Sequence, residues 1–171
     1  VDMLSLIKEY KLPARFPEDV VTEAKSFGDK IDMKDAKNRV DLRDRIVFTI
    51  DGEEAKDLDD AIMIEKTSDG KHYILDVHIA DVSHYVKDRS KLDREARIRG
   101  TSIYMLDRVI PMLPRELSNG LCSLNAGQDR YTLSVQMEID EDGNVVASDI
   151  YKGIIRVTER MSYTDVQKIL D

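Results

Sequence analysis

The feature that most constrains this chain is an acidic run between two apolar, β-rich segments. Positions 51–60 hold six carboxylates and one lysine. Residues 45–50 before the run and residues 61–65 after it have the composition of strands. Two carboxylates about 5 Å apart repel by roughly 3 kcal/mol at an effective dielectric of about 20. The acids therefore either spread into water or are held together by a cation.

The simplest interpretation of such a run is a solvated acidic loop. Strands on both sides favour a second interpretation, because they hold side chains rigidly enough to act as ligands. A calcium loop of the EF-hand type needs Asp-x-Asp-x-Asp-Gly spacing between two helices, and this run has neither. Ligands that are all oxygen select hard cations, Mg2+ or Mn2+. Aspartates that bridge such ions are typical of phosphodiester hydrolysis.

The remaining pattern predicts an α+β domain with a mixed, largely antiparallel sheet and flanking helices. Asp-Gly turns indicate two hairpins, and Ser162 with Asp165 has the pattern of a helix cap. The expected elements are two helices within 3–27 with Pro17 in the first turn of the second, a polar connector at 28–44, hairpins at 61–80 and 131–157, a helix at 91–99, an extended segment at 102–110, a loop with one helical turn at 111–124, and a helix after Ser162.

Composition limits the protein class. A chain of 171 residues with 42% hydrophobic residues predicts one globular domain. Because it has no long apolar run and no leader pattern, we expect a cytoplasmic protein with no membrane span. Cys122, near Leu121 and Leu124, is expected to be a buried, inert thiol. The net charge of -8 opposes RNA binding when taken alone, but divalent cations reverse the sign of an acidic site.

A series of motifs runs along the chain from the acidic run onwards. They occupy 49–61, 78–86, 92–96, 99–104, 109–114, 117–124 and 129–130. In kind and order these motifs resemble those of the ribonuclease II and ribonuclease R family of exoribonucleases. The resemblance implies that residues 42–171 are the N-terminal part of an RNB catalytic domain. Residues 1–41 then form a helical linker that precedes this domain.

The resemblance also implies a function and a set of site residues. Members of the family are hydrolytic 3′-to-5′ exoribonucleases that act on single-stranded RNA 3′ ends, use magnesium and release nucleoside 5′-monophosphates. Their four essential aspartates correspond to Asp51, Asp57, Asp59 and Asp60. Asp51, Asp57 and Asp60 are assigned to metal ligation, and Asp59 is assigned to the network around the scissile phosphate. The family's RNA contacts match Tyr104, which would stack on terminal nucleotides, and Tyr163, which would favour RNA over DNA.

Other interpretations of single residues stay open at the level of sequence. Tyr104 could pack in the core, and Tyr163 could lie on the surface without a role. Lone histidines are more often packed or solvated than bound to metal. Three arginines could bind phosphate or pair with the surplus acids. The histidines are His72, His78 and His84, and the arginines are Arg97, Arg99 and Arg130.

The start at a valine and the unfinished last helix suggest a fragment of a longer protein. The resemblance places an essential arginine and glutamate, the clamp that closes the RNA channel and a basic S1 domain in the missing part. We therefore expect this polypeptide alone to be a monomer and to be inactive or nearly so. One alternative is a catalytically degenerate RNA-binding relative of the same fold. Another is a calcium-binding or purely structural acidic domain.

Overall fold

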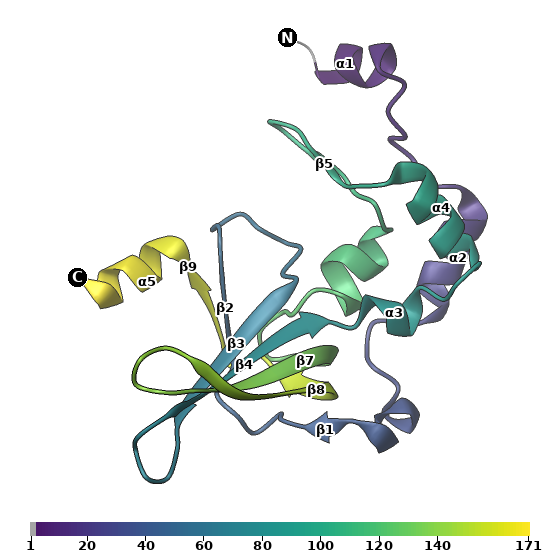
Figure 1. The fold of residues 1–171 in the computed structure, drawn as a ribbon. Coiled ribbons are helices and arrows are strands. Elements are labelled where there is room, and N and C mark those ends of the chain that lie inside the picture. The colour runs from purple at the N-terminus through teal and green to yellow at the C-terminus, as the bar shows by residue number, and fades with distance from the viewer. Residues whose placement is uncertain (1–2) are drawn as a thin grey trace.

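A seven-stranded sheet forms the centre of the protein (Figure 1). The computed structural model describes residues 3–171, so Val1 and Asp2 of the expected linker lie outside the described residues. The strands of this sheet are β1 (Val40–Asp41), β2 (Phe48–Asp51), β3 (Asp60–Lys66), β4 (Tyr73–Ala80), β7 (Asp129–Ile139), β8 (Val145–Arg156) and β9 (Glu159–Ser162). Their order is β1-β8-β7-β4-β3-β2-β9. Only the two outer pairs, β1 with β8 and β2 with β9, are parallel. The predicted mixed, largely antiparallel α+β fold is confirmed.

Short helices and one small hairpin complete the fold. The helices are α1 (Met3–Glu9), α2 (Glu18–Ser26), the 3-10 helix η1 (Met33–Asn38), α3 (Val82–Tyr85), α4 (Lys91–Arg99), the π-helical segment η2 (Glu116–Leu121) and α5 (Tyr163–Leu170). The hairpin consists of β5 (Ile103–Tyr104) and β6 (Val109–Ile110). Among the described residues, no helix is long and apolar enough to cross a membrane.

Most predicted elements form where the local pattern is strong. Both long hairpins are present, and a glycine with positive φ, Gly70 or Gly143, lies in each turn. Helix α5 begins after Ser162, whose hydroxyl accepts from the backbone N–H of Asp165 in a capping box. Pro17, predicted in the first turn of the second helix, instead lies immediately before α2. The predicted connector at 28–44 is not all irregular, because η1 and β1 form within it.

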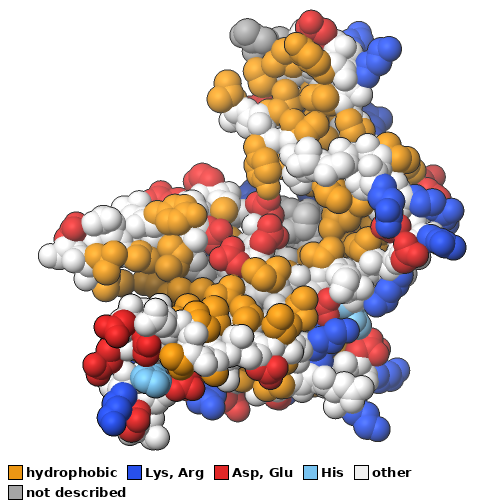
Figure 2. All heavy atoms as spheres, viewed as in Figure 1, with side chains coloured by type: hydrophobic (Ala, Val, Ile, Leu, Met, Phe, Trp, Pro, Cys, Tyr) orange, Lys and Arg blue, Asp and Glu red, His pale blue; other side chains and the backbone are white. Residues whose placement is uncertain are grey.

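The core lies between one face of the sheet and the helices. Helices α2, α4 and η2 contribute side chains to the same cluster as the sheet, so the N-terminal segment packs into the domain. The fully buried members include Ala24, Leu92, Leu117, Leu121, Tyr131 and Ile155. Cys122 is buried, and burial raises the pKa of its thiol to about 12, as expected of an inert cysteine. In the view of Figure 2, hydrophobic side chains also gather over the strands of the sheet.

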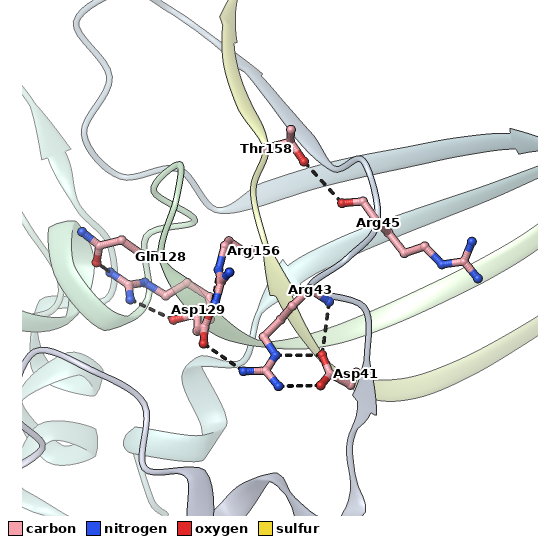
Figure 3. A network of polar contacts seen from close by, with 8 residues as sticks. Asp41, Arg43, Arg45, Gln128, Asp129, Arg156 and Thr158 are labelled. Atoms are coloured by element: carbon pink, nitrogen blue, oxygen red, sulfur yellow. Dashed lines mark hydrogen bonds and ion pairs between the residues drawn. The ribbon is translucent and has the colours of Figure 1, made fainter.

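Ion pairs fix the N-terminal connector to the sheet. Arg43 binds Asp41 through two nitrogens and also donates to Asp129, which accepts a further bond from Arg156 (Figure 3). Arg39 forms a buried ion pair with Asp81 at 2.6 Å, with 4% and 2% of the two side chains exposed. The segment before β2 is therefore held at Asp129 of β7 and at Asp81 after β4, in addition to the pairing of β1 with β8.

Candidate active site

The acidic loop connects two neighbouring strands of the sheet. Asp51 is the last residue of β2 and Asp60 the first of β3. These strands are antiparallel, with Phe48 opposite Ile62, so both aspartates lie at the same edge of the sheet. The loop between them carries Asp57 and Asp59. The fold therefore places all four predicted site residues at this edge.

The charges of these aspartates affect one another. Burial raises the pKa of Asp51, and the charges of Asp60 and Asp57 raise it further, while Arg160 acts in the opposite direction. Burial also raises the pKa of Asp59, and the other three aspartates add to the shift. Such shifts arise when a carboxyl is partly buried and further negative charges lie nearby. The structure thus brings the four carboxylates into one electrostatic cluster, and Figure 2 shows acidic side chains grouped near the centre of this face.

The cluster offers oxygen ligands suited to a hard cation. One oxygen of Asp51, Oδ2, is buried and has no hydrogen-bond partner, which is costly unless a further group binds there. Within residues 3–171, however, no three acidic, histidine or cysteine side chains converge closely enough to hold a metal ion. The Oδ2 atom of Asp57 accepts a hydrogen bond from the Tyr104 hydroxyl. The donor set fits magnesium or manganese in its chemistry, but its members are not drawn together around one point.

Arg160 holds the first half of the acidic loop. Its Nη2 atom donates to the carbonyl oxygens of Glu53 and Ala55 at 2.8 Å, and it lies 3.5 Å from that of Gly52. Arg160 belongs to β9, where it is paired in register with Thr49 of β2. Sequence reasoning did not single out this residue. Its position depends on a short strand, β9, that the pattern of apolar residues does not indicate.

The two predicted RNA-contacting tyrosines are both exposed, with 66% of Tyr104 and 65% of Tyr163 accessible to solvent. Tyr104 lies on β5 and reaches the acidic loop through its bond to Asp57. Tyr163 directly follows Ser162, the register partner of Asp51. Core packing is therefore excluded for both side chains. Their roles toward RNA stay predictions.

The histidines have partners away from the acidic loop. His78 is buried and bonds Ser134, His72 bonds Glu138, and His84 lies 3.5 Å from Asp35. Burial lowers the pKa of His78 and of His84. These contacts account for each histidine as a packed or paired side chain.

The three arginines pair within the protein. Arg97 bonds Asp93, and Arg99 bonds Glu95 as well as backbone carbonyls. Arg130 is buried and donates to the carbonyl oxygen of Ser123 at 2.8 Å. The structure thus favours internal pairing over phosphate binding for these residues.

Comparison with known proteins places the chain in a family. Residues 39–171 match the RNB domain family. The chain belongs to this family. Ribonuclease R of Thermotoga maritima is 53% identical over 100% of this chain and 24% of its own length. Ribonuclease R 2 of Lactococcus lactis is 48% identical over 99% of this chain and 25% of its own length.

Two solved structures share the fold of this chain. The structure of Mycoplasma genitalium RNase R in complex with ribose-methylated single-stranded RNA has a TM-score of 0.89 and 33% identity, covering 98% of this chain and 26% of that one. A yeast pseudonuclease shares the fold at 21% identity with a TM-score of 0.73 over 81% of this chain and 17% of its own. The chain spans about a quarter of the length of its ribonuclease R relatives. The RNB match begins at residue 39, and the domain boundary at residue 42 stays a prediction.

Proposed function

We propose that this chain is the N-terminal part of the catalytic domain of a magnesium-dependent 3′-to-5′ exoribonuclease. The longer protein would release nucleoside 5′-monophosphates from single-stranded RNA. The observation that carries the proposal is the cluster of Asp51, Asp57, Asp59 and Asp60 at one edge of the sheet in a member of the RNB family. The RNA bound in the structure of a relative supports the substrate class.

The side chains of the cluster have separate tasks in this proposal. Asp51, Asp57 and Asp60 would hold two ions of Mg2+ or Mn2+. Bound there, the ions would lower the pKa of the attacking water and offset charge on the leaving oxygen of an in-line hydrolysis. Asp59, whose pKa is raised by burial and by the charges of the other three, would orient groups next to the scissile phosphate. A bound cation would favour the ionised form of Asp51 and Asp59, against burial and the repulsion of their neighbours.

The exposed tyrosines would contact the RNA strand. A phenol ring stacks on any base, so Tyr104 would hold the 3′-terminal nucleotides without regard to sequence. Tyr163, beside the cluster at the start of α5, would lie within reach of a ribose and its 2′-hydroxyl. The chain has a net charge of -8, so we place most phosphate contacts in other parts of the longer protein. For that reason we expect the chain alone to be inactive or nearly so.

The experiment is an RNA degradation assay with the full-length protein. The unsubstituted protein should shorten a 5′-labelled single-stranded RNA to its end, and Asp59→Asn should lose most of this activity. Asp142→Asn, an exposed acid in the turn between β7 and β8, is the matched control and should keep full activity. Undiminished degradation by Asp59→Asn would contradict the proposal.

A catalytically degenerate RNA-binding relative is the second candidate. The observation in its favour is that the same fold occurs in a yeast pseudonuclease. All four aspartates are present in this chain, which favours catalysis. The two candidates separate in the same assay, because the degenerate relative would bind the RNA but leave it intact with either magnesium or manganese. Tighter binding of calcium than of manganese would instead favour a structural acidic domain.

A further inference from the structure

The side chain of Ser123 bonds the backbone on both sides of Asp57. Its hydroxyl accepts a hydrogen bond from the backbone N–H of Leu58 at 3.1 Å and donates one to the carbonyl oxygen of Lys56 at 2.9 Å. The two peptide groups that flank Asp57 are thereby fixed by one side chain from 65 residues away. Ser123 is fully buried, so water does not compete for these bonds.

Ser123 is itself held rigidly. Its N–H donates to the carbonyl oxygen of Gly120 at 3.0 Å, and its carbonyl oxygen accepts from the buried Arg130 at 2.8 Å. The next residue, Leu124, donates its N–H to the carbonyl oxygen of Leu58 at 2.8 Å. Residues 56–58 of the acidic loop do not belong to a strand. Ser123 and Leu124 therefore supply the backbone hydrogen bonds that a neighbouring strand would otherwise provide.

This arrangement leaves the side chain of Asp57 outside the bonds that hold its backbone. The backbone is fixed by Ser123 and Leu124, while Oδ2 of the carboxylate accepts the hydrogen bond from Tyr104. A ligand is effective when its own position is set by the groups behind it. We propose that Ser123 is a positioning residue for Asp57. This inference rests on the function proposed above, in which Asp57 binds a divalent cation.

The test is a manganese titration of the chain, with binding measured by electron paramagnetic resonance. A thermal melt of each variant in chelator accompanies it. Ser123→Ala should raise the manganese Kd about tenfold, within the range found when groups behind a metal ligand are removed. The matched control is Ser134→Ala, which removes another buried hydroxyl, bonded to His78 in β4. This control should lower the melting temperature by a similar amount and leave the manganese Kd unchanged.

Two further variants make the result independent of folding. Ser123→Cys keeps nearly the same shape but forms weaker hydrogen bonds, so its manganese Kd should lie above that of the unsubstituted chain and below a tenfold increase. This variant tests the inference even if Ser123→Ala does not fold. In a double-mutant cycle, Ser123→Ala should add no further loss to Asp57→Asn, because both changes act on one ligand.

The outcomes distinguish this inference from the function on which it rests. If Asp57→Asn weakens manganese binding and both Ser123 variants bind as tightly as the unsubstituted chain, the positioning role is overturned and the proposed function stands. Additive losses in the cycle would also overturn the positioning role. If the unsubstituted chain binds no manganese, the metal site and this inference fall together.

Discussion

The hydroxyl of Tyr104 donates a hydrogen bond to Oδ2 of Asp57. The contact joins the small hairpin β5–β6 to the acidic loop across 47 residues of sequence. Because Asp57 accepts this bond, the pKa of Tyr104 rises to about 12. A predicted RNA contact and a predicted metal ligand are thus linked directly. In the proposed site the same carboxylate would bind a metal ion, so we expect the phenol and the ion to compete for its negative charge.

Removing this bond should strengthen metal binding. Tyr104→Phe frees Oδ2 of Asp57, and an exposed hydrogen bond at the weak end of the usual range, about 0.7 kcal/mol, corresponds to about a threefold change in affinity. We expect the manganese Kd of the chain to fall by about that factor. Tyr10→Phe, an exposed tyrosine at the end of α1, is the control. Weaker manganese binding by Tyr104→Phe would show that the phenol supports the site instead of competing for it.

Burial of Asp59 and the charges of its neighbours should together appear as a pH-dependent loss of stability without metal. The pKa of Asp59 lies above its ordinary value of 3.8, so ionisation of this group destabilises the fold as pH rises through the shifted pKa. In chelator at pH 7, Asp59→Asn should therefore melt on the order of 2 °C higher than the unsubstituted chain. The difference should vanish as the pH falls toward 3.8. An equal or lower melting temperature at pH 7 would argue that the charge of Asp59 does not destabilise the metal-free fold.

The hydrogen bonds from Arg160 should protect the first half of the acidic loop from proteolysis. Arg160→Met removes the bonds to the carbonyl oxygens of Glu53 and Ala55, so local opening should increase. We expect a glutamate-specific protease to cut after Glu53 or Glu54 roughly tenfold faster, the factor that corresponds to one or two lost bonds. Arg45→Met removes an exposed arginine bonded to Glu65 and is the control. Equal cleavage rates in the two variants would mean that Arg160 does not hold the acidic loop closed.

The buried pair of Arg39 and Asp81 should dominate the attachment of the N-terminal connector. Arg39→Leu leaves a buried carboxylate without its partner, which costs about 3 to 5 kcal/mol in free energy of unfolding. Burial raises the pKa of Asp81, but the bonds from Arg39 and Ser83 outweigh it and the pKa is lowered. The stabilisation is therefore complete above pH 3.8 and disappears as pH falls through the shifted pKa.

Urea unfolding at pH 7 and at lower pH measures the effect of Arg39→Leu. The unsubstituted chain and the variant should differ most at pH 7. Arg97→Leu, in which an exposed guanidinium leaves Asp93, should change the unfolding midpoint little. A midpoint for Arg39→Leu that matches the control would mean that the connector is attached by other contacts.

The sequence predicts those parts of the fold that local signals determine. Asp-Gly turns indicate both hairpins, and the Ser162 cap indicates the start of α5. Strand β9 was not predicted, because its four residues become a strand only by parallel pairing with the distant β2. The aspartates of the site could be named from the acidic run and the family resemblance. The supporting contacts could not, because Ser123 and Tyr104 reach the loop across many residues of sequence.

A manganese titration of carboxamide variants shows whether particular aspartates of the acidic loop bind a divalent cation. We expect Asp51→Asn, Asp57→Asn and Asp60→Asn each to weaken manganese binding by about tenfold or more at pH 7. We expect no change for Glu53→Gln and Glu54→Gln, which remove equal charge from exposed positions of the same loop. If the three asparagine variants bind manganese as tightly as the unsubstituted chain does, these aspartates are not metal ligands.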